Sequence, residues 1–438
     1  MTASAVTRVG IDVRMIQNFP TGIGNYLENL IKALAKVPPP FDLSTSSRSP
    51  RGNSRGDLST SSRSPRGNSR GDKLKATPSE VEGSEYQFVL VGNVGNKMEG
   101  WAKNQPRLEF VAIKSKPNSV HQHFLLPFEL LLLNLDLFWT TPWGASILLW
   151  QKYALTIYDL LYRRYPKIAS LKARLYEAFV SKWVAKRASV VFTISEFVKD
   201  DIEGFLGIKK DKIVNISGAA GDAYQPFNGS DVNGFAIDKT LARHRITKPF
   251  FVYLGNFRPH KNLATLLRAF ANIHRFEESP LADYSIFNIK LVLIGSVDAK
   301  GRDRDSENLL NLLKKLKLQK SVILTGRITD DREVAAILNE AVALVHSSFH
   351  EGFGLTVLEA MSCGCPVIAA NTTSVPEVVG EAGILVDPHD VGKFVRAMKS
   401  VLAGERSDLR EKGLEQAKKF SWEKTAKEVL EVFDDYWN

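Results

Sequence analysis

The chain has 438 residues, of which 44% are hydrophobic and 24% are charged, so its length and composition are those of a globular protein with two or three domains. Its net charge of +10 suits phosphate-bearing substrates, an anionic membrane surface or nucleic acid, but the sequence contains no recognisable nucleic-acid-binding module. Its two cysteines, Cys363 and Cys365, are one residue apart, so they cannot form a stabilising disulfide across the fold, and no Cys/His set typical of a zinc site accompanies them. This predicts a reducing compartment.

The N-terminal sequence and the longest apolar stretch both favour a cytoplasmic protein. MTASAVTRVGIDV lacks the basic region and apolar core of a signal peptide. The stretch from Phe124 to Trp150 is interrupted by prolines, a glycine and charged residues, so it falls short of the ~20 apolar residues of a spanning helix. We interpret it as a buried helix followed by a buried strand. Peripheral contact with the inner face of an anionic membrane is the alternative.

The first strand is expected at residues 8–13, and a loop ending in Gly22-Ile23-Gly24 separates it from a helix at 25–36. Two glycines between a strand and a helix let the backbone approach a phosphate closely, so Gly22 and Gly24 are candidate phosphate contacts. The G-x-G-x-x-G fingerprint of dinucleotide-binding domains is absent directly after the strand, which disfavours that class.

Residues 38–84 have the composition of a low-complexity insertion. The sequence DLSTSSRSPRGNSRG occurs twice in tandem, at 42–56 and 57–71, as a 15-residue repeat that is nearly free of apolar side chains. Such a segment cannot bury enough surface to offset its conformational entropy, so we predict a disordered insertion in a surface loop. A basic arm that touches lipid or nucleic acid is the alternative.

Strands and helices alternate through the rest of the chain, a pattern typical of parallel sheets covered by helices on both faces. A polar stretch divides the pattern, so we predict an N-terminal domain at 1–235, a linker at 236–248, a C-terminal domain at 249–420 and a final helix at 421–438. Two doubly wound domains in tandem place ligands at the carboxyl ends of their strands, facing the cleft between them. A long helix is expected to precede the strand at 189–194. The other expected strands cover residues 87–91, 108–113, 136–139, 154–159, 212–216, 251–255, 289–295, 322–325, 343–345 and 366–369.

Arg258 and Lys261 lie three residues apart in the loop after the strand at 251–255. At a strand end both charges can reach one point, where the planar Arg fork and the compact Lys charge suit phosphate oxygens. Two solvated basic residues are the alternative. Asp303-Arg304-Asp305 resembles a metal-binding Asp-x-Asp motif only superficially, and we predict no metal site.

The segment HEGFGLTVLEAMSCGCP, at 350–366, follows an apolar strand with a glycine loop and then a helix. That order places backbone N–H groups and a helix N-terminus at one spot, which attracts anions. Glu351 and Glu359 are eight residues apart, so they point the same way if the helix starts near Glu351. One could then contact a sugar and the other a ribose. From spacing alone, a simple turn with two solvated glutamates is an equal alternative.

The longer segment EGFGLTVLEAMSCGCPVIAANTTSVPEVVGEAGILVDP resembles, almost position by position, the donor-binding segment of the retaining glycosyltransferases of family 4. Fragments of the resemblance recur over most of the chain. It implies an α/β architecture of the GT-B type, in which two Rossmann-like doubly wound domains face a central cleft and the last helix crosses back to the first domain. It also implies a nucleotide-sugar donor, with no cofactor and no metal.

The resemblance implies roles for individual residues. Arg258 and Lys261 would hold the donor diphosphate, and fixed cations there would stabilise the charge that develops on the leaving group. Glu351 would contact the donor sugar near the reacting carbon, and Glu359 would contact the ribose hydroxyls. The remaining implied donor contacts are Gly22, Gly24, Arg327 at the nucleotide base, and the backbone of Gly352, Phe353, Gly354 and Leu355.

One position departs from the family. Within Thr156-Ile157-Tyr158-Asp159-Leu160, the family places a histidine at Tyr158, beside the reacting sugar. Tyrosine can stack or donate a hydrogen bond, but it cannot act as a proton carrier, as histidine can, near neutral pH. Tyr158 and Asp159 are therefore candidate contacts of the sugar or acceptor, with capping of the following turn as the alternative for Asp159.

These features together predict a retaining hexosyltransferase of polysaccharide or glycolipid biosynthesis. The segment GIDVRMIQNFPTGIGNYLENL resembles mannosyl-, glucosyl- and rhamnosyltransferases, and mannose is favoured. The expected donor is GDP-mannose or a UDP-hexose, and the expected acceptor is a saccharide or a lipid-linked saccharide; no nucleic-acid partner is expected. A catalytically impaired nucleotide-sugar-binding subunit and a GT-B-type epimerase are the alternatives.

Overall fold

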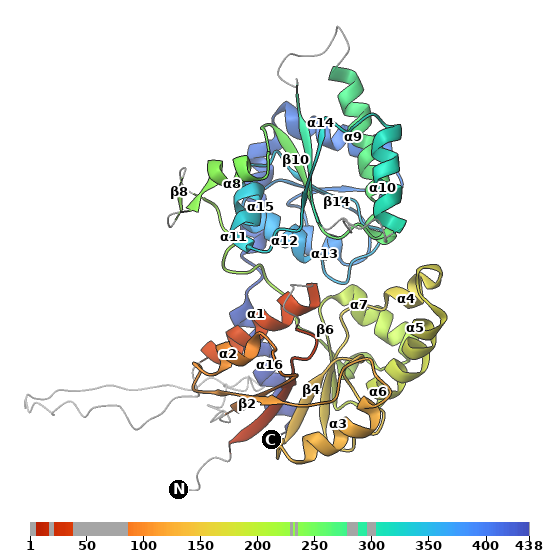
Figure 1. Ribbon diagram of the computed structural model, residues 1–438, viewed down its shortest axis with the longest axis vertical. Helices are drawn as coiled ribbons and strands as arrows, with labels where there is room; N and C mark the ends of the chain where they lie inside the picture. The colour runs from red at the N-terminus through yellow and green to blue at the C-terminus, as the bar shows by residue number, and fades with distance from the viewer. Residues whose placement is uncertain are drawn as a thin grey trace, which may run out of the picture.

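The computed structural model describes residues 6–16, 22–37, 86–227, 231–232, 235–277, 288–295 and 304–437. These residues form two α/β bodies, one above the other in Figure 1. The low-complexity insertion at 38–84 and Asp303 lie outside the described residues.

The lower body in Figure 1 is built on a seven-stranded parallel sheet with the order β3-β2-β1-β4-β5-β6-β7. β4, β5 and β6 are buried along their whole length because helices cover both faces of the sheet, which explains their continuous apolar sequences. The strands are β1 Thr7–Asp12, β2 Tyr86–Gly92, β3 Leu108–Ala112, β4 Leu137–Thr140, β5 Tyr153–Thr156, β6 Val190–Thr193 and β7 Ile213–Asn215.

The helices of this body connect successive strands, as parallel pairing requires. The long helix predicted before β6 is confirmed for residues 171–187, where α5, the π-helical turn η3 and α6 follow one another without a break, whereas the chain before them forms only the short α4 and the 3-10 turn η2. The helices are α1 Gly22–Lys36, α2 Met98–Ala102, α3 Gln122–Leu131, α4 Leu161–Arg164, η2 Pro166–Ile168, α5 Leu171–Leu175, η3 Tyr176–Ser181, α6 Lys182–Arg187, α7 Glu196–Asp201, η4 Ile202–Leu206 and η5 Lys210–Lys212.

The upper body contains a six-stranded parallel sheet with the order β12-β11-β10-β13-β14-β15. Its strands are β10 Phe250–Leu254, β11 Lys290–Ile294, β12 Val322–Gly326, β13 Leu344–His346, β14 Val367–Ala370 and β15 Ile384–Val386, the last of which the sequence analysis did not predict. Its helices are α8 Ile237–Arg243, η6 Pro259–Lys261, α9 Leu263–Glu277, α10 Arg304–Lys315, α11 Asp331–Glu340, α12 Leu355–Ser362, α13 Val375–Val379, α14 Val391–Ser400, η8 Val401–Glu405 and α15 Arg406–Ala417.

Both sheets reverse their direction of growth at one point, between β1 and β4 in the lower body and between β10 and β13 in the upper body. Ligands of open α/β sheets bind outside the carboxyl ends of the strands at such a point. The loops after β10 and β13 therefore occupy the expected ligand position of the upper body.

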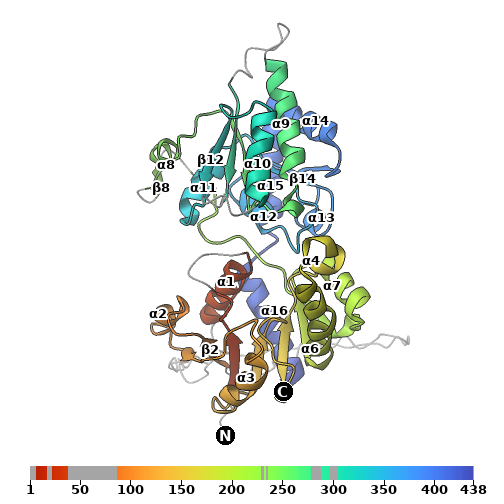
Figure 2. The ribbon, with the colours of Figure 1, turned by 45° about the vertical axis from the view of Figure 1, so that its right-hand side comes forward.

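Helix α16, Trp422–Trp437, follows the upper body in sequence but lies against α1 in the lower one, as Figure 2 shows. Its buried Phe433 packs its ring 5.6 Å from Trp139 and 6.0 Å from Phe192. Thr425 Oγ1 donates a hydrogen bond of 2.6 Å to the carbonyl of Ser217. This helix therefore completes the core of the N-terminal body.

Two stretches differ from their predictions. The predicted linker at 236–248 contains helix α8, whose Ile237 and Leu241 are buried, and α8 packs against α11. The predicted buried helix within 124–150 is wrong for one face of α3, where Phe124 and Phe128 are exposed. Among the described residues, no helix combines the length and apolar character needed to cross a bilayer.

Candidate active site

The loop after β10 is held in place by Asn262, which adopts a left-handed conformation with φ of 54°. Its buried side-chain amide donates to the carbonyls of Ser347, at 3.1 Å, and Pro388, at 2.8 Å. Ser347 Oγ donates in return to the carbonyl of Lys261, at 3.0 Å. These bonds tie the loop after β10 to the loop after β13, so that Lys261 faces the second loop.

Glu351 lies in that second loop, and three side chains converge on one of its oxygens. Lys261 Nζ donates to Glu351 Oε1 at 2.6 Å, Ser348 Oγ donates at 2.7 Å, and His346 Nε2 lies 2.8 Å away. Oε2 has no hydrogen-bond partner within the described part of the chain. The geometry therefore fixes the carboxylate and leaves one oxygen for a ligand.

The charge of Glu351 is stabilised by its surroundings. Burial alone would raise the pKa of this carboxyl, but Lys261 and His346 outweigh burial and hold the pKa well below its usual value. The loop backbone is fixed as well, because the N–H of Glu351 donates to Thr373 Oγ1 at 3.1 Å and Ser374 Oγ donates to its carbonyl at 2.9 Å. Glu351 is thus a charged, oriented acceptor at the carboxyl end of β13.

Arg258 precedes η6, three residues before Lys261, and its side chain is exposed. Its guanidinium lies 3.8 Å from Oδ2 of the partly buried Asp305, a loose ion pair. The structure therefore brings Lys261 and Glu351 into contact and places Arg258 at the same loop, with its guanidinium directed to α10.

The two glutamates occupy different environments. α12 begins at Leu355, so the prediction that the helix starts near Glu351 is wrong, and the two carboxylates do not share a helix face. Glu359 is buried within α12, and burial, reinforced by Asp331, raises the pKa of its carboxyl well above the usual value. The neutral form of Glu359 is therefore favoured, in contrast to Glu351.

The glycine loop before α12 lies directly against the lower body. A Cβ on Gly352 would sit 2.2 Å from the carbonyl oxygen of Tyr158, and Ser195 Oγ donates to the Gly352 carbonyl at 2.7 Å. Gly354 has a φ of 106°, which favours glycine, and Phe353 is buried with its ring 5.8 Å from Phe420. Leu355, the first residue of α12, is partly buried in the core.

The residue before Glu351 is a second point of contact between the bodies. His350 is buried, and its ring meets Tyr165 at 5.8 Å and Phe197 at 5.9 Å, both edge-on. Neither ring nitrogen has a hydrogen-bond partner within the described residues, and burial lowers the pKa of this imidazole. Tyr165 also donates its hydroxyl to the carbonyl of Phe349, at 3.2 Å. The loop carrying Glu351 is therefore positioned by both bodies.

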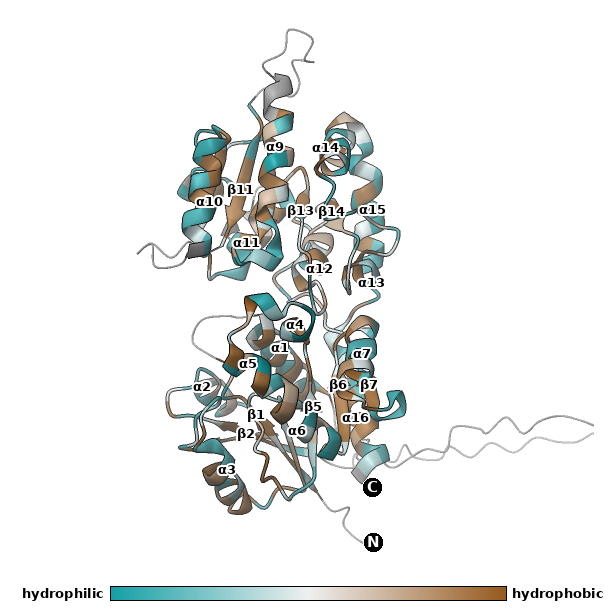
Figure 3. Cartoon of the chain, turned by 90° about the vertical axis from the view of Figure 1, so that its right-hand side faces the viewer, coloured by the Kyte–Doolittle hydropathy of each residue, from teal (hydrophilic) through white to brown (hydrophobic). Residues whose placement is uncertain are grey.

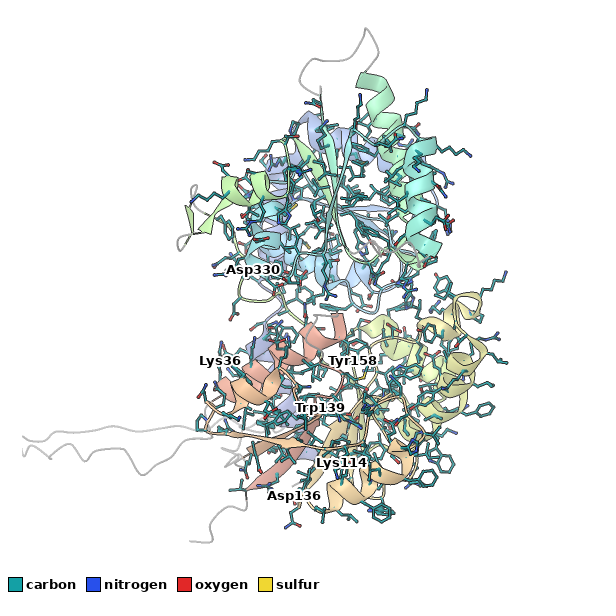
Figure 4. The ribbon with its side chains drawn as sticks, in the orientation of Figure 1. Lys36, Lys114, Asp136, Trp139, Tyr158 and Asp330 are labelled. Atoms are coloured by element: carbon teal, nitrogen blue, oxygen red, sulfur yellow. The ribbon has the colours of Figure 1, made fainter. Side chains whose placement is uncertain are left out.

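Tyr158 and Asp159 are the residues of the lower body that lie against Gly352. Figure 4 shows Tyr158 at the upper end of the lower body; its ring is buried edge-on against Tyr26, with centroids 5.4 Å apart. Burial raises the pKa of the Tyr158 phenol, with Asp12 adding to the effect. Asp159 is exposed, and its Oδ1 accepts from the Leu161 N–H at 3.1 Å, so that its side chain caps the following turn.

The remaining predicted donor contacts lie on separate loops. Gly22 opens α1, and nothing lies within 4 Å of a Cβ added to it, whereas Gly24, in the same first turn, is buried. Arg327 is exposed directly after β12.

Sequence reasoning missed His346 and Ser348, both of which contact Glu351 Oε1. A signal was present, because His346-Ser347-Ser348 is a polar run at the end of an apolar strand. Polar residues at the carboxyl end of a parallel strand commonly face a ligand. Within the described residues, no cluster of three His, Cys, Asp or Glu side chains could hold a metal ion.

Known proteins resemble this chain in sequence and in structure. A family model described as "Glycosyl transferases group 1" matches residues 237–420. The "Serotype-specific mannosyltransferase WbdA" of Escherichia coli is 32% identical over 257 residues, which is 57% of this chain and 29% of that protein. The "O-antigen chain mannosyltransferase B" of Escherichia coli is 29% identical over 249 residues, 56% of this chain and 60% of that protein. The match thus spans less than two thirds of either relative.

The structure of HepE from Anabaena in complex with UDP-glucose is similar over nearly the whole length. It covers 98% of this chain and 99% of HepE with a TM-score of 0.69 and 14% sequence identity. Structural similarity at this low sequence identity shows the fold alone, and the GT-B fold expected from the sequence is confirmed.

Proposed function

We propose that the whole chain is a retaining hexosyltransferase, because the family model of the glycosyl transferases group 1 matches residues 237–420. The proposed reaction moves mannose from GDP-mannose to a saccharide or lipid-linked acceptor in polysaccharide biosynthesis. The mannosyltransferase relatives support mannose over glucose, and UDP-hexose is the competing donor. The proposed place of action is the cytoplasm, with peripheral contact at an anionic membrane.

The contact between Lys261 and Glu351, at the carboxyl ends of β10 and β13, is the observation that carries the proposal. Lys261 has further N–H donors besides the one directed to Glu351, and Arg258 lies on the same loop. In the proposed reaction the bond from the sugar's anomeric carbon to the diphosphate breaks, and these cations stabilise the departing charge without a metal ion.

Retention is proposed to occur by attack on the face that the diphosphate leaves. The acceptor oxygen bonds to the anomeric carbon, and its proton passes to the departing phosphate oxygen. A double displacement would need two carboxyl groups that flank one bond. Glu351 is charged beside Lys261, whereas Glu359 is buried beside Asp331, and this separation of environments favours the single-face route.

The roles of donor-binding residues follow from their positions. Glu351 Oε2 is proposed to accept from a sugar hydroxyl, and the backbone N–H groups between Gly352 and Leu355, at the start of α12, to meet the phosphates. Arg327 is proposed to contact the base, and Glu359 the ribose. In this proposal Tyr158, which stands in place of the family's histidine, transfers no proton, since burial raises the pKa of its hydroxyl.

A thermal-denaturation panel tests the proposal, using GDP-mannose, UDP-glucose, GDP and UDP on wild type, Glu351→Gln and an exposed control, Glu381→Gln. A ligand at ~100 times its Kd adds about 2.7 kcal/mol to stability, so the correct nucleotide series gives a visible rise in Tm. We expect GDP and GDP-mannose to stabilise all three proteins. Release of GDP from GDP-mannose in the presence of acceptor should fall about 100-fold or more only in Glu351→Gln.

Each outcome of the panel has a distinct meaning. A rise in Tm with UDP and UDP-glucose alone would mean that the donor is a UDP-hexose rather than GDP-mannose. A shift without turnover in the wild type supports the nucleotide-sugar-binding subunit, and turnover of the donor into an epimer without acceptor supports the epimerase. Equal turnover in Glu351→Gln contradicts the role assigned to Glu351.

A further inference from the structure

The helical run from α5 through η3 to α6 turns an apolar stripe toward solvent. Leu171, Leu175, Phe179 and Trp183 follow one another at intervals of four residues, and they are 49% to 70% exposed. On a surface helix such a stripe normally faces the core. Here the core contacts are made by the opposite side, where Val184 and Ala185 are buried.

A second exposed apolar surface on α3 continues this stripe. Phe124 and Phe128 are both 61% exposed, and the ring of Phe128 lies 5.9 Å from that of Trp150. The segment before Trp150 reaches α6, because Trp183 Nε1 donates to the carbonyl of Ile147 at 3.2 Å. We call this surface the apolar face; Figure 3 shows α3, α5 and α6 on the same side of the lower body. It consists of Phe124, Phe128, Leu131, Leu132, Leu148, Trp150, Leu171, Leu175, Phe179 and Trp183.

The apolar face is bordered by positive charge. Residues 163–187 contain eight Lys and Arg and a single acid, Glu177, which is buried. Lys172, Arg174 and Lys186 are exposed and make no ion pair with the described residues. The apolar side chains therefore stand beside three exposed cations that have no counter-charge among the described residues.

We propose that the apolar face docks on an anionic lipid bilayer, with the run from α5 to α6 lying in the headgroup region. A Trp and a Phe ring beside Lys and Arg side chains match the interface between headgroups and acyl chains. Phosphate headgroups supply the counter-charge that the protein lacks. A second copy of this chain is a poor occupant, because a two-fold contact would bring the same basic segment against itself.

The same segment links the membrane surface to the cleft. It begins beside α4, where Tyr165 donates to the carbonyl of Phe349, two residues before Glu351. A docked bilayer would therefore lie on the body whose edge meets the proposed catalytic loop. Insofar as it names the side from which a lipid-linked acceptor arrives, this inference rests on the proposed function; the docking itself does not.

Vesicle flotation of the full chain tests the docking without any nucleotide sugar. The probes are vesicles of phosphatidylglycerol and phosphatidylcholine in equal parts, and vesicles of phosphatidylcholine alone. We expect binding to the anionic vesicles that is about tenfold stronger than to the neutral ones and that weakens with added salt. The double variant Phe179→Ser/Trp183→Ser should lose about tenfold of that binding.

Two further variants separate the apolar and charge contributions. Val94→Ser/Leu310→Ser removes exposed apolar side chains elsewhere and should float as the wild type does. Lys172→Gln/Lys186→Gln should weaken only the anionic binding. All variants change exposed positions, so unchanged thermal unfolding is the check on their folding.

Several results would overturn the docking. Absence of flotation with anionic vesicles, or equal flotation of Phe179→Ser/Trp183→Ser, contradicts it. A wild-type dimer in sedimentation analysis that this variant converts to a monomer would assign the face to a second copy. Because flotation needs no donor, its failure leaves the nucleotide panel intact, and failure of the panel leaves flotation intact.

Discussion

At the scale of single residues, the proposed site depends on a carboxylate whose two oxygens differ. Three side-chain groups surround Oε1 of Glu351, so the plane of the carboxylate is fixed before any ligand arrives. Such preorganisation lowers the cost of orienting a charged group during reaction. His346 and Ser348 are therefore positioning residues for Glu351.

The buried carboxyl of Glu177 should make the stability of the protein depend on pH. Burial, with a smaller contribution from Asp159, raises the pKa of its carboxyl from 4.5 to about 7, and Arg163 offsets part of the effect. Between these values the folded chain keeps a proton that the unfolded chain has released. The stability that the protonated carboxyl contributes is therefore complete at low pH and is lost as the pH rises through about 7.

Glu177→Gln keeps this position neutral at every pH. We expect the Tm of the variant, relative to the wild type, to increase from about pH 5 to about pH 8 and then to level. The measurement is thermal unfolding monitored by circular dichroism across that range. A difference in Tm that does not change with pH would mean that Glu177 is already charged in the folded protein.

The residues of the site differ in how far the sequence could reveal them. Glu351 and Lys261 were predicted, and their contact follows from loops at the ends of neighbouring strands. A shared helix face for Glu351 and Glu359 requires a helix that starts near Glu351, which the left-handed Gly354 prevents. The burial of Tyr158 depends on its neighbour Tyr26, far away in sequence, and no local pattern could reveal it.

At the scale of elements, the glycine loop between β13 and α12 is a close contact between the bodies. The Cβ that Gly352→Ala would add meets a backbone oxygen of Tyr158, which cannot rotate away as a side chain could. We expect the variant to lose about 1–3 kcal/mol of stability. It should also lose turnover, because Glu351 moves with the loop.

Denaturant unfolding and release of nucleoside diphosphate measure these two effects. Gly100→Ala is the matched control, since nothing lies within 4 Å of its added Cβ in α2. That change should leave turnover intact and raise stability by about 0.4–1 kcal/mol. Normal stability and turnover in Gly352→Ala would show that the bodies separate at this loop during function.

Strands were easier to predict than the helices between them. Buried parallel strands such as β10 are short apolar runs, which the sequence marks clearly. β15 was missed because only part of it is buried. The long helix before β6 was predicted correctly over residues 171–187, but its apolar stripe faces solvent rather than the core.

At the scale of the whole molecule, α16 holds the N-terminal body together from the other end of the described chain. Phe433→Ala would leave a cavity beside Trp139 and Phe192, both buried. We expect a loss of about 3–5 kcal/mol in the free energy of unfolding. The measurement is equilibrium denaturation of the full chain.

The matched control is Glu431→Ala, an exposed change to alanine on the same helix. It should stay within about 0.5 kcal/mol of the wild type. Equal effects of the two changes would mean that α16 is only loosely attached to the lower body.

The position of α16 at the end of the described chain also sets the order in which the two bodies can fold during translation. Translation reaches α16 roughly 200 residues after β7, a delay on the order of 10 to 40 s at ordinary rates of synthesis. Throughout that interval the rings of Trp139 and Phe192 lack their cover, Phe433. The first body to be made is therefore the last to be finished, and its nascent form carries an exposed aromatic surface on which chaperones can act.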